Sequence, residues 1–173
     1  RYMVPRLSRG ARVVIANQEP GHVGLEARAK GIREVLQGEL GATVEQLDIT
    51  QDPTRAIGVL RSYFQAHPDT AAIFTLGPLG TIPTVRFLTE QGLAGKVAVA
   101  SFDLDPVTVR AIRDGIVAAT VDQQQYLQGF ISVLQLYLYV KYGFAPTDYN
   151  TGRGLVTREN VDAVAALVEQ GIR

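Results

Sequence analysis

Short apolar runs alternate with longer segments of helical periodicity along most of this chain, and this alternation constrains the fold more than any other feature. The runs are rich in Val, Ile and Ala, and in the longer segments apolar residues recur every three or four positions. Such an order is typical of a parallel sheet whose strands are joined by crossover helices. The predicted strands are Arg12–Ala16, Val44–Asp48, Ala71–Leu76, Val97–Phe102 and Val117–Val121.

Two of these strands indicate a sheet that is covered on both faces. Val13, Val14 and Ile15 are consecutively apolar, and so are the residues from Ala71 to Phe74. A strand with one face in water would instead alternate polar and apolar residues. We therefore predict an α/β three-layer sandwich with a central, mainly parallel sheet.

Several helices carry clear sequence signals. Asp52-Pro53 and Asp105-Pro106 each offer a capping carboxylate followed by proline at the first helical position. The helix after the first strand is predicted to end at Gly38 and Gly41. Two helices show an inner stripe at helical spacing, formed by Leu25, Ala29, Ile32 and Leu36 in the first and by Val161, Val164, Ala165 and Val168 in the last.

The segment Tyr126–Tyr142 differs from the other helical segments because it has almost no polar face. A helix that is apolar all round must be covered on several sides, and one small lobe offers too little surface for that. We expect the cover to come from a second lobe outside this chain or from a partner chain. A homodimer through residues 126–142 is therefore one expectation.

Composition excludes several classes of function. With 17 basic and 17 acidic residues, the charge balance favours neither nucleic acid nor an anionic membrane surface. No apolar run approaches the roughly 20 residues that cross a bilayer, so we expect no direct membrane insertion. The absence of cysteine excludes disulfides, thiol catalysis and thiolate metal sites. The chain opens on Arg1, and we expect any signal segment or lipid anchor to lie outside it.

Motifs for catalysis or cofactor binding are weak. The loop at residues 17–24 lacks the GxGxxG spacing of a dinucleotide site, and residues 75–80 lack the Lys-Ser/Thr of a phosphate-binding loop. No GxSxG is present. His22 and His67 are the only histidines, with no second metal ligand at a suitable spacing, and Glu19 with His22 is more simply two polar loop residues than an acid–base pair. We expect no catalytic residue, no cofactor and no metal.

Three polar residues are better candidates for a binding site. Asp103 directly follows the strand ending at Phe102, Gln123 follows the strand ending at Val121, and Arg28 lies near the start of the first helix. Ligands of open α/β sheets bind at the carboxyl ends of the strands. Guanidinium, carboxylate and amide groups offer directed donors and acceptors, which suit a polyhydroxylated ligand. A capping role for Asp103 and a plain surface role for Arg28 are the alternatives.

Four segments, in this order, resemble the type I periplasmic sugar-binding proteins of the ribose-binding class, the solute-binding proteins of ABC transporters. The resemblance covers nearly the whole chain and places it as the C-terminal lobe. The matching segments are Gly24–Ile32, Ala66–Phe74, Val99–Asp103 and Ala118–Gln123.

The resemblance implies a ligand-binding set of Arg28, Asp103, Gln123 and the position of Gly77. Gly77 stands where the family usually has an asparagine ligand, and Pro53 stands where an aromatic residue stacks on the sugar. These two departures imply a reshaped pocket, so that another sugar, a polyol or a sugar-like signal is expected as the ligand in place of ribose.

The resemblance also implies the organisation and role of the protein. Residues 1–122 would form the C-terminal ligand-binding lobe, residues 123–147 a crossover helix, and residues 148–173 a return segment with a final helix. The full-length protein would close on its sugar and deliver it to an ABC-type import permease, in the periplasm or outside the cell at the membrane. Two alternatives stay open: the ligand-sensing domain of a sugar-responsive transcription regulator, and an α/β enzyme acting on a sugar or nucleotide.

Overall fold

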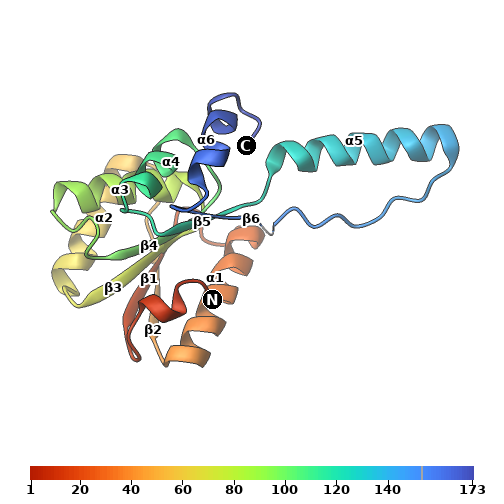
Figure 1. Ribbon diagram of the computed structural model, residues 1–173. Coiled ribbons are helices and arrows are strands. Elements are labelled where there is room, and N and C mark those ends of the chain that lie inside the picture. Colours follow the sequence, from red (N-terminus) through yellow and green to blue (C-terminus); the bar gives the residue numbers. More distant parts are fainter. Residues whose placement is uncertain (153) are drawn as a thin grey trace.

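A computed structural model, which describes residues 1–152 and 154–173, shows a three-layer α/β fold around one six-stranded sheet (Figure 1). The strand order is β2-β1-β3-β4-β5-β6, and the first five strands pair in parallel. The predicted fold class is therefore confirmed. The strands are β1 (Arg12–Asn17), β2 (Thr43–Asp48), β3 (Thr70–Thr75), β4 (Ala98–Phe102), β5 (Ala119–Asp122) and β6 (Gly154–Thr157).

Helices cover the two faces of the sheet unequally. On one face lie α2 (Pro53–Ala66), α3 (Pro78–Glu90), α4 (Pro106–Arg113) and α6 (Val161–Glu169); the other carries α1 (Val23–Leu40) and the short 3-10 helix η1 (Val4–Arg6) (Figure 1). Each face has its own apolar core. The sheet contributes alternate residues to the two cores, for example Val14 to the first and Val13 to the second.

The capping signals work as the sequence predicts, with one exception. The Asp52 carboxylate accepts the backbone N–H of Arg55, and the Asp105 carboxylate accepts that of Val107. Gly41 ends α1 in the left-handed conformation, at φ 61°, which glycine adopts without steric cost. Gly38 does not mark the helix end, because it lies inside α1.

The sixth strand was not predicted from the sequence. Residues Gly154–Thr157 pair antiparallel with β5, so the sheet is mainly rather than wholly parallel. Only four residues long, β6 has too little periodicity to stand out from a loop. The final helix that follows buries its predicted stripe of Val161, Val164, Ala165 and Val168.

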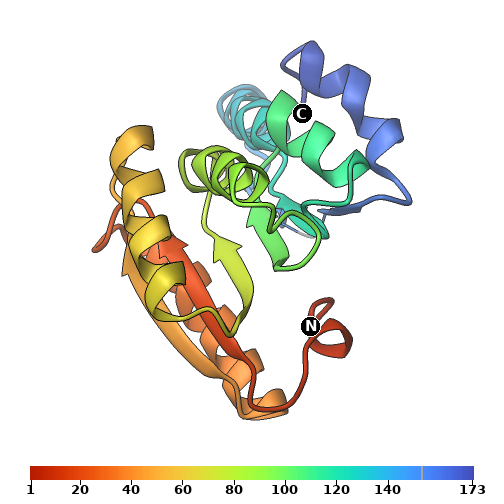
Figure 2. The same ribbon diagram turned by 90° about the vertical axis from the view of Figure 1, so that its left-hand side faces the viewer.

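The apolar helix α5 (Gln125–Tyr142) projects away from the sheet and its helices (Figure 1), and Figure 2 views it nearly end-on. None of its residues is buried, and Val133, Leu136 and Val140 are among its exposed large side chains. The expectation that this lobe cannot cover the helix is therefore confirmed. Within the described residues, no helix combines the length and apolarity that crossing a bilayer requires.

The coverage of the sheet on both faces holds for β1 and β3 but not for the whole sheet. Beside α1, the face of β4 and β5 borders a cavity of about 510 Å³. Its apolar wall includes Phe74, Ala100, Phe102, Val121 and Ile32. The α1 layer is thus narrower than the sheet that it covers.

Candidate functional site

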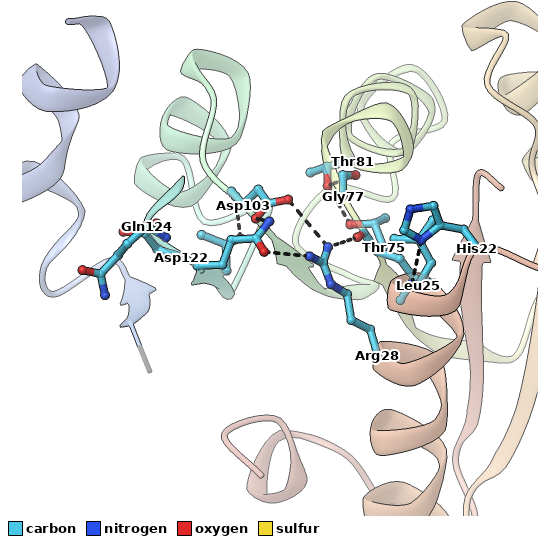
Figure 3. Close-up of polar contacts among 12 residues, drawn as sticks. His22, Leu25, Arg28, Thr75, Gly77, Thr81, Asp103, Asp122 and Gln124 are labelled. Carbon is cyan, nitrogen blue, oxygen red and sulfur yellow. Dashed lines mark hydrogen bonds and ion pairs between the residues drawn. The ribbon is translucent and has the colours of Figure 1, made fainter. Parts of the chain in front are cut away.

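Arg28 on α1, Asp103 after β4 and Gln123 after β5 form one hydrogen-bonded cluster (Figure 3). Arg28 Nη1 lies 3.6 Å from Asp103 Oδ2. Arg28 Nη2 donates to Gln123 Oε1 at 3.2 Å, and Gln123 Nε2 donates to Asp103 Oδ1 at 2.6 Å. The three residues that the sequence singled out are therefore neighbours at the carboxyl edge of the sheet.

The backbone of Asp103 is held firmly in an uncommon conformation. Its φ of 69° is left-handed, which aspartate tolerates better than most residues. The Asp103 N–H donates to the Val121 carbonyl at 2.8 Å, and the Asp103 carbonyl accepts from Thr120 Oγ1 at 2.7 Å. Strand β5 therefore fixes where the carboxylate that follows β4 points.

Arg28 is fixed from two further sides. Its Nη1 donates to the Leu76 carbonyl at 2.6 Å, just after the end of β3. Its Cζ lies 4.7 Å from the centre of the Phe102 ring, a cation–π distance. Because guanidinium has five N–H donors and a planar shape, Arg28 links β3, β4 and β5 at their ends and keeps donor capacity for a ligand.

Electrostatics at Asp103 reflect two opposing effects. Burial raises the pKa of Asp103 above its usual 3.8, and the Arg28 charge and the Gln123 hydrogen bond oppose that rise. The residue is only 7% exposed. A ligand hydroxyl would give this buried carboxylate a further hydrogen-bond donor, which would favour binding.

Of the two positions that depart from the family pattern, Gly77 directly follows Leu76, whose carbonyl Arg28 bonds, whereas Pro53 begins α2. Gly77 occupies the capping position of α3 and accepts hydrogen bonds from the backbone N–H groups of Gly80 and Thr81. A Cβ at residue 77 would lie 3.0 Å from Gln18 Nε2. Pro53 is the exposed first residue of α2.

The histidines have structural positions in this fold. His22 caps α1, with Nδ1 accepting the Leu25 N–H at 3.4 Å (Figure 3). His67 ends α2 and packs on Tyr63, with ring centres 4.7 Å apart. Among residues 1–152 and 154–173, no group of three His, Asp or Glu side chains is arranged to hold a metal ion.

Sequence reasoning missed a second polar cluster where β5 leads into α5. Asp122, whose side chain is 1% exposed, accepts from Arg173 Nη1 at 2.8 Å and from the Gln124 N–H at 2.8 Å. The Gln124 and Gln128 amides both bond Thr151, at 3.0 Å each. Asp122 follows a strand in the same manner as Asp103, but nothing in the sequence points to a partner 51 residues away.

The apolar cavity beside α1 adjoins Arg28 but differs from the polar cluster in chemistry. It is lined mainly by aliphatic and aromatic side chains, with few polar groups such as Ser101 and Thr120. A hydroxyl-rich ligand requires hydrogen-bond partners, because polar groups that lose water without replacement cost free energy. The cluster at the strand ends is therefore the candidate ligand site.

Known proteins resemble this chain in sequence and in fold. The model of a periplasmic binding protein domain matches residues 1–143. The chain is 32% identical to a xylose/arabinose-binding protein from Sulfolobus acidocaldarius over 88% of its own length and 39% of that protein. The chain thus spans well under half of this relative.

Solved structures share the fold. A periplasmic sugar-binding protein of an ABC sugar transporter from Legionella pneumophila is 35% identical, with a TM-score of 0.79 over 87% of this chain and 55% of the other. A candidate LacI transcriptional regulator from Bacteroides fragilis is 24% identical, with a TM-score of 0.79 over 93% of this chain and 57% of the other. The second likeness concerns the fold alone.

Proposed function

We infer the function from one premise: the chain belongs to the periplasmic binding protein family, as a lobe of the type I sugar-binding class of ABC transporter solute-binding proteins. We propose that it binds a sugar or a sugar-like polar solute, such as a polyol, through Arg28, Asp103 and Gln123. The convergence of these three side chains at the carboxyl ends of the strands carries the proposal. We further propose that the full-length protein delivers its ligand to an ABC-type import permease.

The chemistry of the cluster suits hydroxyl groups. Asp103 accepts one hydrogen bond from Gln123 and forms one ion pair with Arg28. A carboxylate has about four acceptor positions, so others stay available. Two of the five N–H donors of Arg28 bond Leu76 and Gln123. The remaining donors and acceptors match adjacent hydroxyls of a sugar, each of which both donates and accepts.

The same family relationship supports a proposed division of the chain. Residues 1–122 would be the C-terminal ligand-binding lobe, residues 123–147 would cross to pack on a second lobe, and residues 148–173 would return. The exposed α5 supports this division, because its large apolar side chains find no cover within this lobe. A second lobe would supply the other half of the pocket and close over the ligand as a hinged receptor.

We propose binding without turnover. The named relatives are binding proteins, and His22, at the start of α1, is engaged as a helix cap. Incubation of the full-length protein with its ligand, followed by mass spectrometry, would return the ligand unchanged. A new product would favour the enzyme alternative.

A sugar-responsive transcription regulator would share this fold. The segment that precedes the lobe in the full-length protein would distinguish it from a transport protein. A helix-turn-helix there would favour a transcription regulator, whereas a secretory leader would favour the transport role. We propose a periplasmic or extracellular location at the membrane, in keeping with the relative described as a periplasmic sugar-binding protein.

A thermal-shift screen of the full-length protein tests the proposal. Pentoses, hexoses, inositols and furanose signals would be compared, and at least one should raise the melting temperature, because binding stabilises the folded state. Arg28→Ala and Asp103→Ala should abolish that shift. An undiminished shift in both variants would show that the ligand binds elsewhere.

A further inference from the structure

The Gln18 side chain is buried at the carboxyl end of β1 without a hydrogen bond. Gln18 is 8% exposed, and its Oε1 is fully buried with no partner among the described residues. Buried amide groups are almost always satisfied, so the unpaired carboxamide of Gln18 requires an explanation.

Two glycines make the space that this carboxamide fills. A Cβ at residue 77 would lie 3.0 Å from Gln18 Nε2, and one at residue 80 would lie 3.3 Å from Gln18 Oε1. Gly77 has a φ of 170°, which is extended backbone that any residue adopts. The backbone therefore does not require glycine at residue 77, but a side chain there would press on the Gln18 amide.

The carboxamide lies at the same strand ends as the ligand cluster. Strand β1 pairs with β3, with Ala16 opposite Thr75, so the residues following the two strands are neighbours. Arg28 donates to the carbonyl of Leu76, the residue before Gly77. Helix α3 begins at Pro78 without a side-chain cap. Gly77 therefore lies next to both the Gln18 amide and the carbonyl that Arg28 bonds.

We propose that Gln18 is a further ligand-contacting residue and that its carboxamide helps to determine which sugar the site accepts. The Nε2 group of a carboxamide carries two N–H donors, which pair with the oxygens of adjacent hydroxyls. A site built to bond a given hydroxyl rejects analogues that lack it or present it differently, because its own polar group is then left unpaired. This inference rests on the proposed sugar-binding function and names one more residue of the same site.

Calorimetric titration of the full-length protein with D-xylose, L-arabinose and D-ribose tests the proposal. Gln18→Met removes the amide at nearly constant volume, and Gly77→Ala places a methyl against the same amide from the opposite side. Each variant should lower the affinity for the best sugar about tenfold or more. Each should also bring the affinities for the three sugars closer together. The double variant should lose no more than Gln18→Met alone, because both changes act on one group.

Gln91→Ala is the matched control, since Gln91 is exposed at the opposite end of α3. Unchanged affinities and ratios in Gln18→Met would overturn the role of Gln18 while leaving the sugar-binding function intact. If the unmutated protein bound no sugar, the proposed function would fall and this inference with it.

A second measurement covers the case in which the variants unfold. In ¹H–¹⁵N spectra of the unmutated protein, the Gln18 amide pair should shift when the best sugar is added. The pair is assigned as the resonances missing from the spectrum of a Gln18→Glu variant. An amide pair that does not respond to saturating sugar would overturn the proposal.

Discussion

Arg28 Nη1 lies 3.6 Å from Asp103 Oδ2, and the two side chains are further joined through Gln123, which bonds both of them. Arg28 comes from α1 and Asp103 from the end of β4. The pair therefore connects the helix on one face of the sheet to the strand ends where the ligand is proposed to bind. Its geometry determines what substitutions at either residue should do.

Arg28→Lys should weaken sugar binding by the full-length protein although the positive charge remains. A lysine ammonium lacks the planar fork that reaches Leu76 and Gln123 together. Loss of charge-assisted hydrogen bonds predicts a fall in affinity of about 10- to 100-fold in calorimetry. Lys30→Ala, at an exposed position of the same helix, should bind as the unmutated protein does. Equal affinity for Arg28→Lys would show that charge alone suffices.

Asp103→Asn should change the pH dependence of stability. Burial raises the pKa of Asp103 above 3.8, so the folded state holds this proton more tightly than the unfolded state does. The stability from this group is complete below the unfolded pKa and is lost as pH rises through the folded pKa. An asparagine does not titrate, so Asp103→Asn should gain stability relative to the unmutated protein as the pH rises above 3.8 and through the raised pKa of Asp103.

Denaturant unfolding at a series of pH values measures this difference. Sugar affinity should fall in Asp103→Asn, because the carboxylate acceptor is lost. Asp114→Asn, at the end of α4, provides the comparison at an aspartate outside the cluster. A stability difference between Asp103→Asn and the unmutated protein that narrowed toward neutral pH would contradict the predicted sign.

Arg173→Ala should destabilise the lobe, because Arg173 is the cationic partner of Asp122. The Asp122 carboxylate is 1% exposed and would lose its cationic partner while keeping the Gln124 N–H. Removing one partner of a buried pair is costly, and the partial exposure of Arg173 moderates the loss to about 1–2 kcal/mol. Chemical denaturation would measure it, with exposed Arg110→Ala as control. If Arg173→Ala were as stable as Arg110→Ala, the ion pair between Arg173 and Asp122 would contribute little to the free energy of unfolding.

The 173-residue chain should self-associate through α5, as the sequence suggests. Val133, Leu136 and Val140 lie on successive turns and are 69%, 62% and 76% exposed. Contiguous exposed apolar surface of this kind drives association. Sedimentation velocity should show a dimer, and Val133→Glu with Leu136→Glu should return a monomer. The control Val23→Glu, at an exposed valine outside α5, should leave the dimer intact. A monomeric unmutated chain would refute the prediction.

The sequence by itself determined the layered α/β class, the five parallel strands to within about two residues, and the proximity of Arg28, Asp103 and Gln123. These features follow from local rules. Buried parallel strands read as continuous apolar runs, and residues that follow such strands meet at one edge of the sheet. Asp52 and Asp105 cap their helices for equally local reasons.

Only the tertiary structure decided the relationships between residues far apart in the chain. The pairing of Asp122 with Arg173, the strand Gly154–Thr157 against β5, and the Gln18 amide over Gly77 each depend on chain segments that no periodicity connects. The open face beside α1 likewise depends on how far one helix extends across the sheet. Such contacts are set by the packing of the whole lobe, because hydrogen bonding and burial are shared among elements rather than carried by one segment.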